Sequence, residues 1–313
     1  MIMRECLTFA PLYMQRLWGG TALEATFRRS VPVGGPIGES WELVDREDAQ
    51  SVVDFGPWHG STLHDLWTRH RLEVFGEGFG QPRFPLLFKI LDASEMLSLQ
   101  VHPPEHVASR LQGEPKSEVW YFVATRPGAG VYAGVKHGTT KAHFKSALAA
   151  GSIERLVHRV ETFADTFLFV PSGRLHAIDG GNILFEIQQN SDTTYRVFDW
   201  NRPGLDGKPR QLHVTESLES IDFFDFEPEL NRISGETVVH CEHFEVDRWM
   251  LQEARCANEN PRFAVFQCVS GEVLFGDRKF RAGDLFLVPA SAYREKLKPL
   301  TKSSVVLRTT IRE

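Results

Sequence analysis

The chain has 313 residues, of which 42% are hydrophobic and 24% charged, and its formal net charge is -6. These values are ordinary for a globular protein and exclude a long disordered or fibrous chain. An acidic balance without a stripe of lysine and arginine argues against a nucleic-acid partner. No apolar run in the sequence approaches the length of a membrane span.

The cysteines and the N-terminal residues indicate a compartment. The cysteines lack C-x-x-C spacing and are interpreted as free thiols in a reducing cytosol. The first residues carry no apolar segment followed by a small-residue cleavage site, so we expect a cytoplasmic protein. The four cysteines are Cys6, Cys241, Cys256 and Cys268.

The first predicted elements are mostly extended. Residues 7–18 predict a strand that leads into two glycines, and residues 38–44 predict another strand with Glu39 at its mouth. A Ser-Thr cap followed by apolar positions predicts a short helix over 61–70. The glycine-rich piece 76–80 lacks a strand-then-helix context, so it is interpreted as a loop and not as a nucleotide site.

An apolar run over 84–91 predicts a strand that is buried on both faces. Lys89 interrupts this run. Its ammonium group either reaches the rim of the strand or faces an internal cavity, and we favour the rim.

Residues 97–102 alternate between apolar and polar side chains, the pattern of a half-buried strand. Gln100 and His102 therefore point to the same face, about 7 Å apart along the strand axis. Pro103-Pro104 ends the strand, because neither residue can donate a hydrogen bond to a neighbouring strand.

Two later segments each carry one more potential metal ligand. A strand over 116–124 has Glu118 near its start, and a strand over 165–170 breaks at Pro171-Ser172-Gly173 and then delivers His176. Taken singly, a histidine beside a proline turn is usually structural, and a glutamate before an aromatic strand is usually solvated. The joint order of the donors favours a metal site.

These donors suit a borderline divalent ion such as Zn²⁺ and leave a position for substrate or water. We predict one Zn²⁺ per chain, with other divalent ions as alternatives. The predicted ligands are Gln100, His102, Glu118 and His176.

The remaining pattern consists of short helices and many strands. Helices are predicted over 106–112, 141–150 and 215–220, and Thr140 or its neighbour caps the second of them. Residues 167–200 alternate between strand and turn. Further strands are predicted at 131–135, 158–162, 236–240, 243–251, 262–269, 272–275, 285–288 and 304–311.

The C-terminal strands repeat one feature of the ligand-bearing stretch. Arg281-Ala282-Gly283-Asp284 followed by Val288-Pro289 mimics Asp165–Pro171, but no histidine follows the second proline. We therefore expect the part of the chain after residue 232 to pack and cover rather than to supply ligands.

The order of the donors is that of cupin barrels, and four motifs resemble type I mannose-6-phosphate isomerase (phosphomannose isomerase), especially its short bacterial form. The motifs are Gln100-Val101-His102-Pro103, Lys116–Tyr121, Pro171–His176 and Gln188–Arg196. The resemblance covers nearly the whole chain. It implies a mainly β fold of two cupin-type (jelly-roll) β-barrel halves with a few short helices.

On this interpretation the chain has two domains. Residues 1–232 form a catalytic cupin domain that carries the metal site and helical insertions. Residues 233–313 form a degenerate, cupin-like β domain.

The resemblance also implies catalytic residues. Arg196 matches an active-site arginine of the family, and Asp192 accompanies it; a buried Arg–Asp pair that locks a loop is the structural alternative. Lys116 matches the lysine that precedes the glutamate ligand, with a role in phosphate binding or proton transfer. The alternative for Lys116 is a flexible surface lysine, and Arg16 is a weaker candidate for contacting an anionic substrate.

One position departs from the long members of the family. They carry a histidine before the lysine, whereas this chain has Pro115. The general base therefore stays open between Glu39, Lys116 and a metal-bound water.

The leading hypothesis is a metal-dependent aldose–ketose isomerase that interconverts mannose 6-phosphate and fructose 6-phosphate through an enediol(ate). The alternatives are a related isomerase acting on another aldose or an unphosphorylated sugar, an Fe²⁺-dependent cupin oxygenase, and a sugar-binding cupin without turnover. The oxygenase is disfavoured because Gln100 stands where such sites usually have histidine. We expect a sugar-phosphate ligand, no nucleic-acid or membrane partner, and a monomer or homodimer.

Overall fold

The computed structural model describes residues 5–32, 34–56 and 58–312. The chain forms two compact units whose segments alternate along the sequence. Unit 1 comprises Met1–Leu12, Trp41–Phe88 and Ile233–Glu313, and unit 2 comprises Tyr13–Ser40 and Lys89–Arg232.

The boundary between units at Arg232 falls where the sequence predicted a domain boundary, but the two earlier segments of unit 1 lie within the predicted first domain. The chain passes from one unit to the other inside strands β2 (Leu12–Gly20), β3 (Ile37–Leu43) and β5 (Leu86–Ala93). A junction inside a strand carries no Pro/Gly-rich linker, which is the signal that a sequence offers for a boundary. The assignment of 1–232 and 233–313 as domains stays a prediction.

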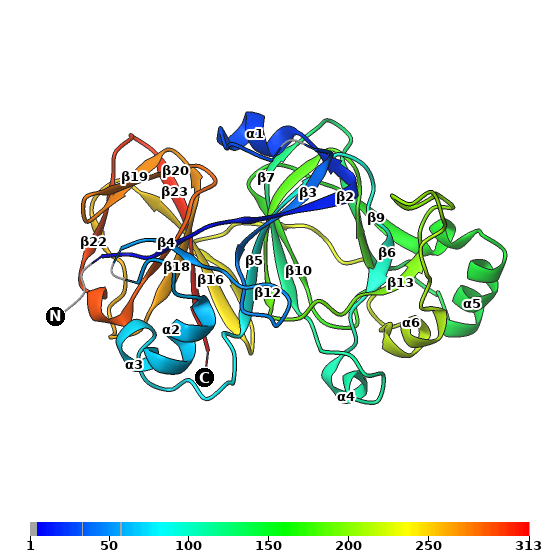
Figure 1. Ribbon diagram of the computed structural model, residues 1–313. Helices are drawn as coiled ribbons and strands as arrows, with labels where there is room; N and C mark the ends of the chain where they lie inside the picture. The colour runs from blue at the N-terminus through cyan, green and yellow to red at the C-terminus, as the bar shows by residue number, and fades with distance from the viewer. Residues whose placement is uncertain (1–4, 33, 57, 313) are drawn as a thin grey trace. The chain divides into compact units, whose positions relative to one another are not determined.

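Unit 2 contains two sheets (Figure 1). The seven-stranded sheet has the order β14-β10-β7-β12-β5-β3-β2, and the five-stranded sheet has the order β13-β6-β11-β8-β9. Besides β3 and β5, the strands are β2 (Leu12–Gly20), β6 (Leu99–Val101), β7 (Glu118–Thr125), β8 (Gly130–Val135), β9 (Val157–Glu161), β10 (Thr166–Val170), β11 (His176–Ile178), β12 (Asn182–Gln189), β13 (Tyr195–Phe198) and β14 (Asn231–Arg232).

Short helices accompany these sheets. Thr140 caps α5 by accepting a hydrogen bond from the backbone N–H of His143, and the helix ends before Gly151, whose φ is +67°. α6 packs beside β13 and β6 (Figure 1). The predicted helix over 106–112 is shorter than expected. The helices of unit 2 are α1 (Ala22–Phe27), α4 (Glu105–Ala108), α5 (Lys141–Ala149), the 3₁₀ turn η1 (Ile153–Leu156) and α6 (Val214–Ser220).

The apolar residues of strand β6 fix its position by packing against the helices of unit 2. Leu99 and Val101 belong to the cluster that also contains Phe144 of α5 and Leu218 of α6. Gln100 lies between them and points to the opposite face. The strand is shorter than the alternation predicted, because Leu97 packs in a different cluster with Trp120 and Leu184.

Unit 1 also contains two larger sheets, of order β15-β16-β23-β18-β21 and β17-β22-β19-β20, and a two-stranded sheet of β1 and β4. A capping box formed by Thr62 and Asp65 starts α2, as expected for the predicted helix. The elements are β1 (Thr8–Phe9), β4 (Val53–Phe55), α2 (Leu63–Arg69), α3 (Arg71–Val74), β15 (Thr237–His240), β16 (Phe244–Leu251), β17 (Arg255–Cys256), β18 (Ala264–Ser270), β19 (Glu272–Phe275), β20 (Arg278–Arg281), β21 (Leu285–Val288), η2 (Ala290–Ala292), β22 (Lys296–Pro299) and β23 (Ser304–Ile311).

The predicted mainly β, cupin-like architecture with few short helices is confirmed. The described strands of each unit make separate sheets and not closed barrels. Among the described helices, none is long and apolar enough to cross a membrane.

Candidate active site

Three neighbouring strands of unit 2 place polar side chains in one row. In the antiparallel register, Gln100 of β6 stands opposite His176 of β11 on one side and opposite Arg196 of β13 on the other. Residues directly opposite each other in an antiparallel pair project to the same face. Gln100, His176 and Arg196 therefore share the face that β6 turns away from its helices.

This geometry places two of the predicted ligands, His102 and His176, beside Gln100. His102 lies two residues beyond Gln100, and its carbonyl accepts a hydrogen bond of 2.8 Å from the N–H of Gly173. Gly173 has a φ of +94°, which favours glycine, so the Pro171–Gly173 turn is tied directly to the end of β6. The turn then brings His176 back beside β6.

Glu118 comes from the other sheet. It is the first residue of β7, where it stands opposite Val170 of β10 and Gln188 of β12. Ser172 fixes this entry by accepting a hydrogen bond from the N–H of Lys116 and donating its own N–H to the hydroxyl of Ser117, at 3.1 and 3.2 Å. The carboxylate thus faces the five-stranded sheet.

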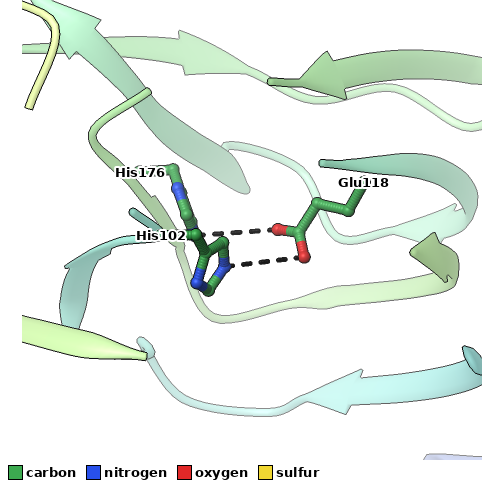
Figure 2. Close-up of side chains that lie close together, drawn as sticks. All are labelled: His102, Glu118 and His176. Atoms are coloured by element: carbon green, nitrogen blue, oxygen red, sulfur yellow. Dashed lines mark ion pairs between the residues drawn. The ribbon is translucent and has the colours of Figure 1, made fainter. Parts of the chain in front are cut away.

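His102, Glu118 and His176 form a compact buried triad (Figure 2). One carboxylate oxygen of Glu118 lies 3.6 Å from Nε2 of His102, and the other lies 3.6 Å from Nε2 of His176. The potential ligand atoms all lie within 4.8 Å of one another. Each of the three residues is at most 1% exposed.

The hydrogen bonds of the imidazoles fit a metal ion. Nδ1 of His102 contacts the carbonyl oxygen of Thr193 at 2.8 Å, and Nδ1 of His176 contacts the carbonyl oxygen of Arg174 at the same distance. A carbonyl can only accept, so both Nδ1 atoms carry hydrogen and both Nε2 atoms present a lone pair. Among the residues that the structure describes, the Nε2 atoms of His102 and His176 and Oε1 of Glu118 have no hydrogen-bond partner. Buried polar atoms without partners are costly, and a divalent cation would satisfy all three.

The electrostatics hold these ligands in the forms that bind metal. Burial, with a contribution from Lys116, lowers the pKa of His102 to about 4. Burial also lowers the pKa of His176. For Glu118, burial raises the pKa, but Lys116 and the two histidines outweigh it and hold the pKa well below its usual value. Neutral imidazoles and an ionised carboxylate are the ligand states required.

A second cluster of buried charges adjoins the triad. Nζ of Lys116 lies 2.9 Å from Glu118 and 3.9 Å from Glu186, and Nζ of Lys89 lies 3.0 Å from Glu186. The indole N–H of Trp120 donates to the other oxygen of Glu186 at 3.0 Å. Glu186 therefore bridges two lysines.

The position of Lys89 corrects the prediction that it reaches a rim. It is 4% exposed and lines an internal cavity. Burial lowers its pKa, but the nearby carboxylates, above all Glu186, outweigh burial and raise it. The carboxylate partner keeps the ammonium inside, because it replaces the water that the rim would have offered.

A cavity of about 350 Å³ connects these groups within unit 2. Gln100 lines it beside a set of charged side chains that carries more positive than negative groups, which favours an anionic occupant. Arg16 and Glu39 lie in the cavity wall and pair with each other through two hydrogen bonds of 3.1 Å. The lining cations are Arg16, Lys89, Lys116, Arg196 and Arg210, and the lining carboxylates are Glu39, Glu186 and Asp192.

Arg196 is held by Gln211 and His213 and not by Asp192. Its Nη1 donates to the carbonyl oxygen of Gln211 at 2.9 Å, and its backbone N–H donates to Nδ1 of His213 at 3.1 Å. In the described part of the chain, Arg196 and Asp192 form no ion pair, and Asp192 is exposed at the cavity. The alternative of a buried Arg–Asp pair locking the loop is therefore wrong.

The comparisons with known proteins agree with this geometry. A model of the phosphomannose isomerase type I catalytic domain matches residues 7–122. Mannose-6-phosphate isomerase ManA of Bacillus subtilis (strain 168) is 37% identical over 308 residues, which cover 94% of this chain and 96% of the relative. The chain belongs to the type I mannose-6-phosphate isomerases.

Solved structures of this family share the fold. The crystal structure of the mannose 6-phosphate isomerase from Bacillus subtilis has a TM-score of 0.86 at 30% identity, and the alignment covers 98% of this chain and 99% of that one. A mannose 6-phosphate isomerase bound with zinc and yttrium has a TM-score of 0.74, with 98% and 100% of the chains covered. Its 16% identity makes this second likeness one of fold alone.

Sequence reasoning named most of the charged residues that line this cavity but missed two of them. Gln100, Lys116, Asp192 and Arg196 all line the cavity, and Arg16 and Glu39 line it too. Glu186 was missed because it lies inside the apolar strand β12 and looks like one polar residue in a buried run. Arg210 was missed because it lies in a loop without a periodic pattern.

Proposed function

We propose that this protein is a metal-dependent aldose–ketose isomerase that interconverts mannose 6-phosphate and fructose 6-phosphate through an enediol(ate). The observation that carries this proposal is the buried His102–Glu118–His176 triad with unpartnered donor atoms. It adjoins a cavity whose lining is rich in lysine and arginine. The reaction is the one named for the similar ManA protein.

We assign the metal site to one Zn²⁺ held by Gln100, His102, Glu118 and His176. Two imidazoles, a carboxylate and an amide oxygen form a borderline donor set, which suits zinc better than calcium or magnesium. When bound, such an ion polarises a carbonyl and stabilises negative charge that develops on its oxygen. The related fold that was crystallised with zinc is in keeping with this choice.

Lys116 is the group best placed to act on the reacting carbons. Its ammonium lies at the cavity wall between Glu118 and Glu186, so it is fixed beside the metal ligands. From there it can donate a hydrogen bond to an oxygen of the substrate as negative charge builds up. Glu186, which also holds Lys89, keeps both lysines in place.

Asp192 and Arg196, which also line the cavity, complete the proposed catalytic set. Arg196 offers a planar guanidinium that can grip two oxygens of an anionic substrate. Asp192 is exposed at the cavity and can accept a hydrogen bond from a sugar hydroxyl. Glu39 is a poorer candidate for the base, since both of its oxygens accept hydrogen bonds from Arg16.

The compartment follows from the thiols. All four cysteines are free, and two of them are buried. Free thiols persist in a reducing compartment, so we place the enzyme in the cytoplasm. Independently of the thiols, we propose that it is a monomer or a homodimer.

The test is a coupled assay for fructose 6-phosphate formed from mannose 6-phosphate. The protein is first stripped with a chelator and then given Zn²⁺. We expect turnover to be lost on stripping and restored by stoichiometric Zn²⁺. Zinc binding without turnover of mannose 6-phosphate would contradict the proposed reaction, and equal turnover of unphosphorylated mannose would favour the alternative isomerase.

A further inference from the structure

Unit 1 contains a cavity of about 520 Å³ that the proposed reaction does not use. Asp247 and Trp249 line it from β16, Lys296 lines it from β22, and Arg308 lines it from β23. Residues 254–260, in and beside β17, complete the lining. The volume lies in the range of sites for small metabolites. This cavity is called the unit 1 cavity.

The sheets beside the unit 1 cavity and the isomerase cavity share a strand order. The order β10-β7-β12-β5 in unit 2 corresponds to the order β21-β18-β23-β16 in unit 1. The first strand of each series ends in a valine, and a proline follows it. The valine stands opposite Glu118 in unit 2 and opposite Ala264 in unit 1. Unit 1 therefore has an alanine at the position of the proposed metal ligand, and an alanine side chain cannot bind a metal ion.

An ion pair lines both cavities at the next position along these strands. Two residues further along β7 and β18, the facing residue on the neighbouring strand is Glu186 in unit 2 and Arg308 in unit 1. Glu186 pairs with Lys89 of β5 at 3.0 Å, and Arg308 pairs with Asp247 of β16 at 3.3 Å. All four side chains line their cavities. Unit 1 thus keeps a cavity and an ion pair at the same place, with the two charges exchanged between the strands.

The unit 1 cavity has unused hydrogen-bond donors. Arg308 donates one hydrogen bond to Asp247 and two to the chain at residues 257 and 258. Three of its five N–H groups are therefore occupied. The indole N–H of Trp249 is buried and has no acceptor in the part of the chain that the structure describes. Because buried donors without acceptors are costly, this lining favours a ligand rich in acceptor oxygens.

The charges of the lining also favour an anion. The lining cations are Arg255, Lys296 and Arg308, and the lining carboxylates are Asp247 and Glu259. Glu236 pairs with Arg255 at 2.7 Å from outside the lining, but both of these side chains are exposed. Burial lowers the pKa of Arg308, against the opposite effect of Asp247 and Glu245. The carboxylates therefore compensate this largely buried guanidinium only in part.

We infer that the unit 1 cavity is a second ligand site, which binds the phosphate or carboxylate group of a small metabolite without a metal ion. Arg255, Lys296 and the free N–H groups of Arg308 bind the oxyanion. The guanidinium of Arg255 lies 3.8 Å from the centre of the Trp249 ring, which places this tryptophan beside the ligand. These residues are not among the described residues that line the isomerase cavity, so the inference does not depend on the proposed function.

The test uses NMR to follow the indole signals of the full-length, zinc-loaded protein after its tryptophans are labelled with ¹⁵N. The chain has seven tryptophans, and the signal that disappears in Trp249→Phe belongs to Trp249. At constant ionic strength we expect inorganic phosphate to shift this signal until the site is saturated. Arg255→Gln should raise the Kd for phosphate by about 10-fold, the loss for one charge-assisted contact.

Lys298→Gln is the matched control. Lys298 lies in β22 with Lys296, and both are exposed, but Lys298 is not among the described residues that line the unit 1 cavity. This substitution also removes one positive charge from unit 1, so the Kd should change by less than about 2-fold. An unchanged Kd in Arg255→Gln, or an equal loss of affinity in Lys298→Gln, would overturn the inference.

The signal of Trp18 separates the two cavities, because Trp18 lines the isomerase cavity. Phosphate that shifts the Trp18 signal alone would overturn the inference and leave the proposed function intact. A saturable shift of the Trp249 signal in a protein that does not isomerise mannose 6-phosphate would support the second site and contradict the proposed function. If Trp249→Phe does not fold, Arg255→Gln identifies the same signal, because it removes the guanidinium that lies on that ring.

Discussion

Each unit contains two larger sheets, but the residues between the sheets differ in polarity. In unit 1 the core cluster contains a stack of phenyl rings, with ring centroids 4.0 Å apart for Phe280 and Phe286 and 5.3 Å apart for Phe266 and Phe286. In unit 2 the space beside the apolar clusters holds ionised groups such as Glu118 and Glu186. Unit 1 buries charge too, but its buried Asp45 is paired with Arg83 at 3.2 Å. The charges of unit 2 differ because the buried Lys89, Lys116 and Glu186 line one cavity.

The divergence can be traced to the residues after one proline. In unit 2, β10 ends at Val170, and the turn at Pro171 leads to His176. In unit 1, β21 ends at Val288, and Pro289 leads into the 3₁₀ turn η2. In both units a strand ends in valine and is followed by proline. The residues after the proline therefore decide whether a metal ligand follows.

Of the substitutions that test this comparison, His176→Ala should have the largest effect. Loss of one imidazole leaves three of the four proposed donors, so we expect bound zinc to be lost and turnover to fall by more than about 1,000-fold. Metal content by mass spectrometry and the coupled assay measure both effects. Arg196→Ala is the matched contrast, since it should keep the metal and lose rate. Full activity in either variant would remove that residue from the proposed site.

The opposite perturbation is Phe286→Ala in unit 1. Phe286 is fully buried and stacks on two other rings, so we expect the free energy of unfolding to fall by about 3–5 kcal/mol. Denaturant titration gives the folded fraction of the variant. Its activity per folded molecule, assayed at low temperature, should stay unchanged. A fall in kcat at full metal occupancy would mean that unit 1 takes part in turnover.

The smallest expected effect concerns His213. Its pKa is lowered by burial and by Arg196, with Glu216 acting in the opposite direction. The unfolded chain therefore binds a proton near pH 6.5 that the folded chain resists, so stability is full above that pH and falls as the pH drops towards the lower folded pKa.

His213→Asn should remove this slope, because asparagine does not titrate and its amide oxygen can still accept from the N–H of Arg196. The difference in Tm between the two proteins, measured from pH 7.5 to 5, should shift in favour of the variant as the pH falls. The shift should be small, since His213 is partly exposed. A constant difference across this range would show that His213 does not contribute.

The sequence predicted those parts of the site that depend on local pattern. Alternation around Gln100 and His102 and the proline turn before His176 are local signals, and family motifs supplied Lys116 and Arg196. The pairing of Lys89 with Glu186 could not be predicted, because it joins two strands far apart in the chain and each residue looks like an exception to an apolar run. The same holds for Asp199 and Arg210, whose contact depends on the path of a loop.

The alternation of segments between the units has a consequence for how the chain folds. In unit 1, Leu7 and Leu287 exchange two backbone hydrogen bonds, of 2.8 and 2.9 Å. During synthesis on the ribosome, β1 can pair with β4 early, but Leu7 must wait for nearly the whole chain before it meets Leu287. Unit 2 needs nothing beyond Arg232. We expect unit 2 to form while translation continues and unit 1 to close last, at the rate set by a contact of very long range.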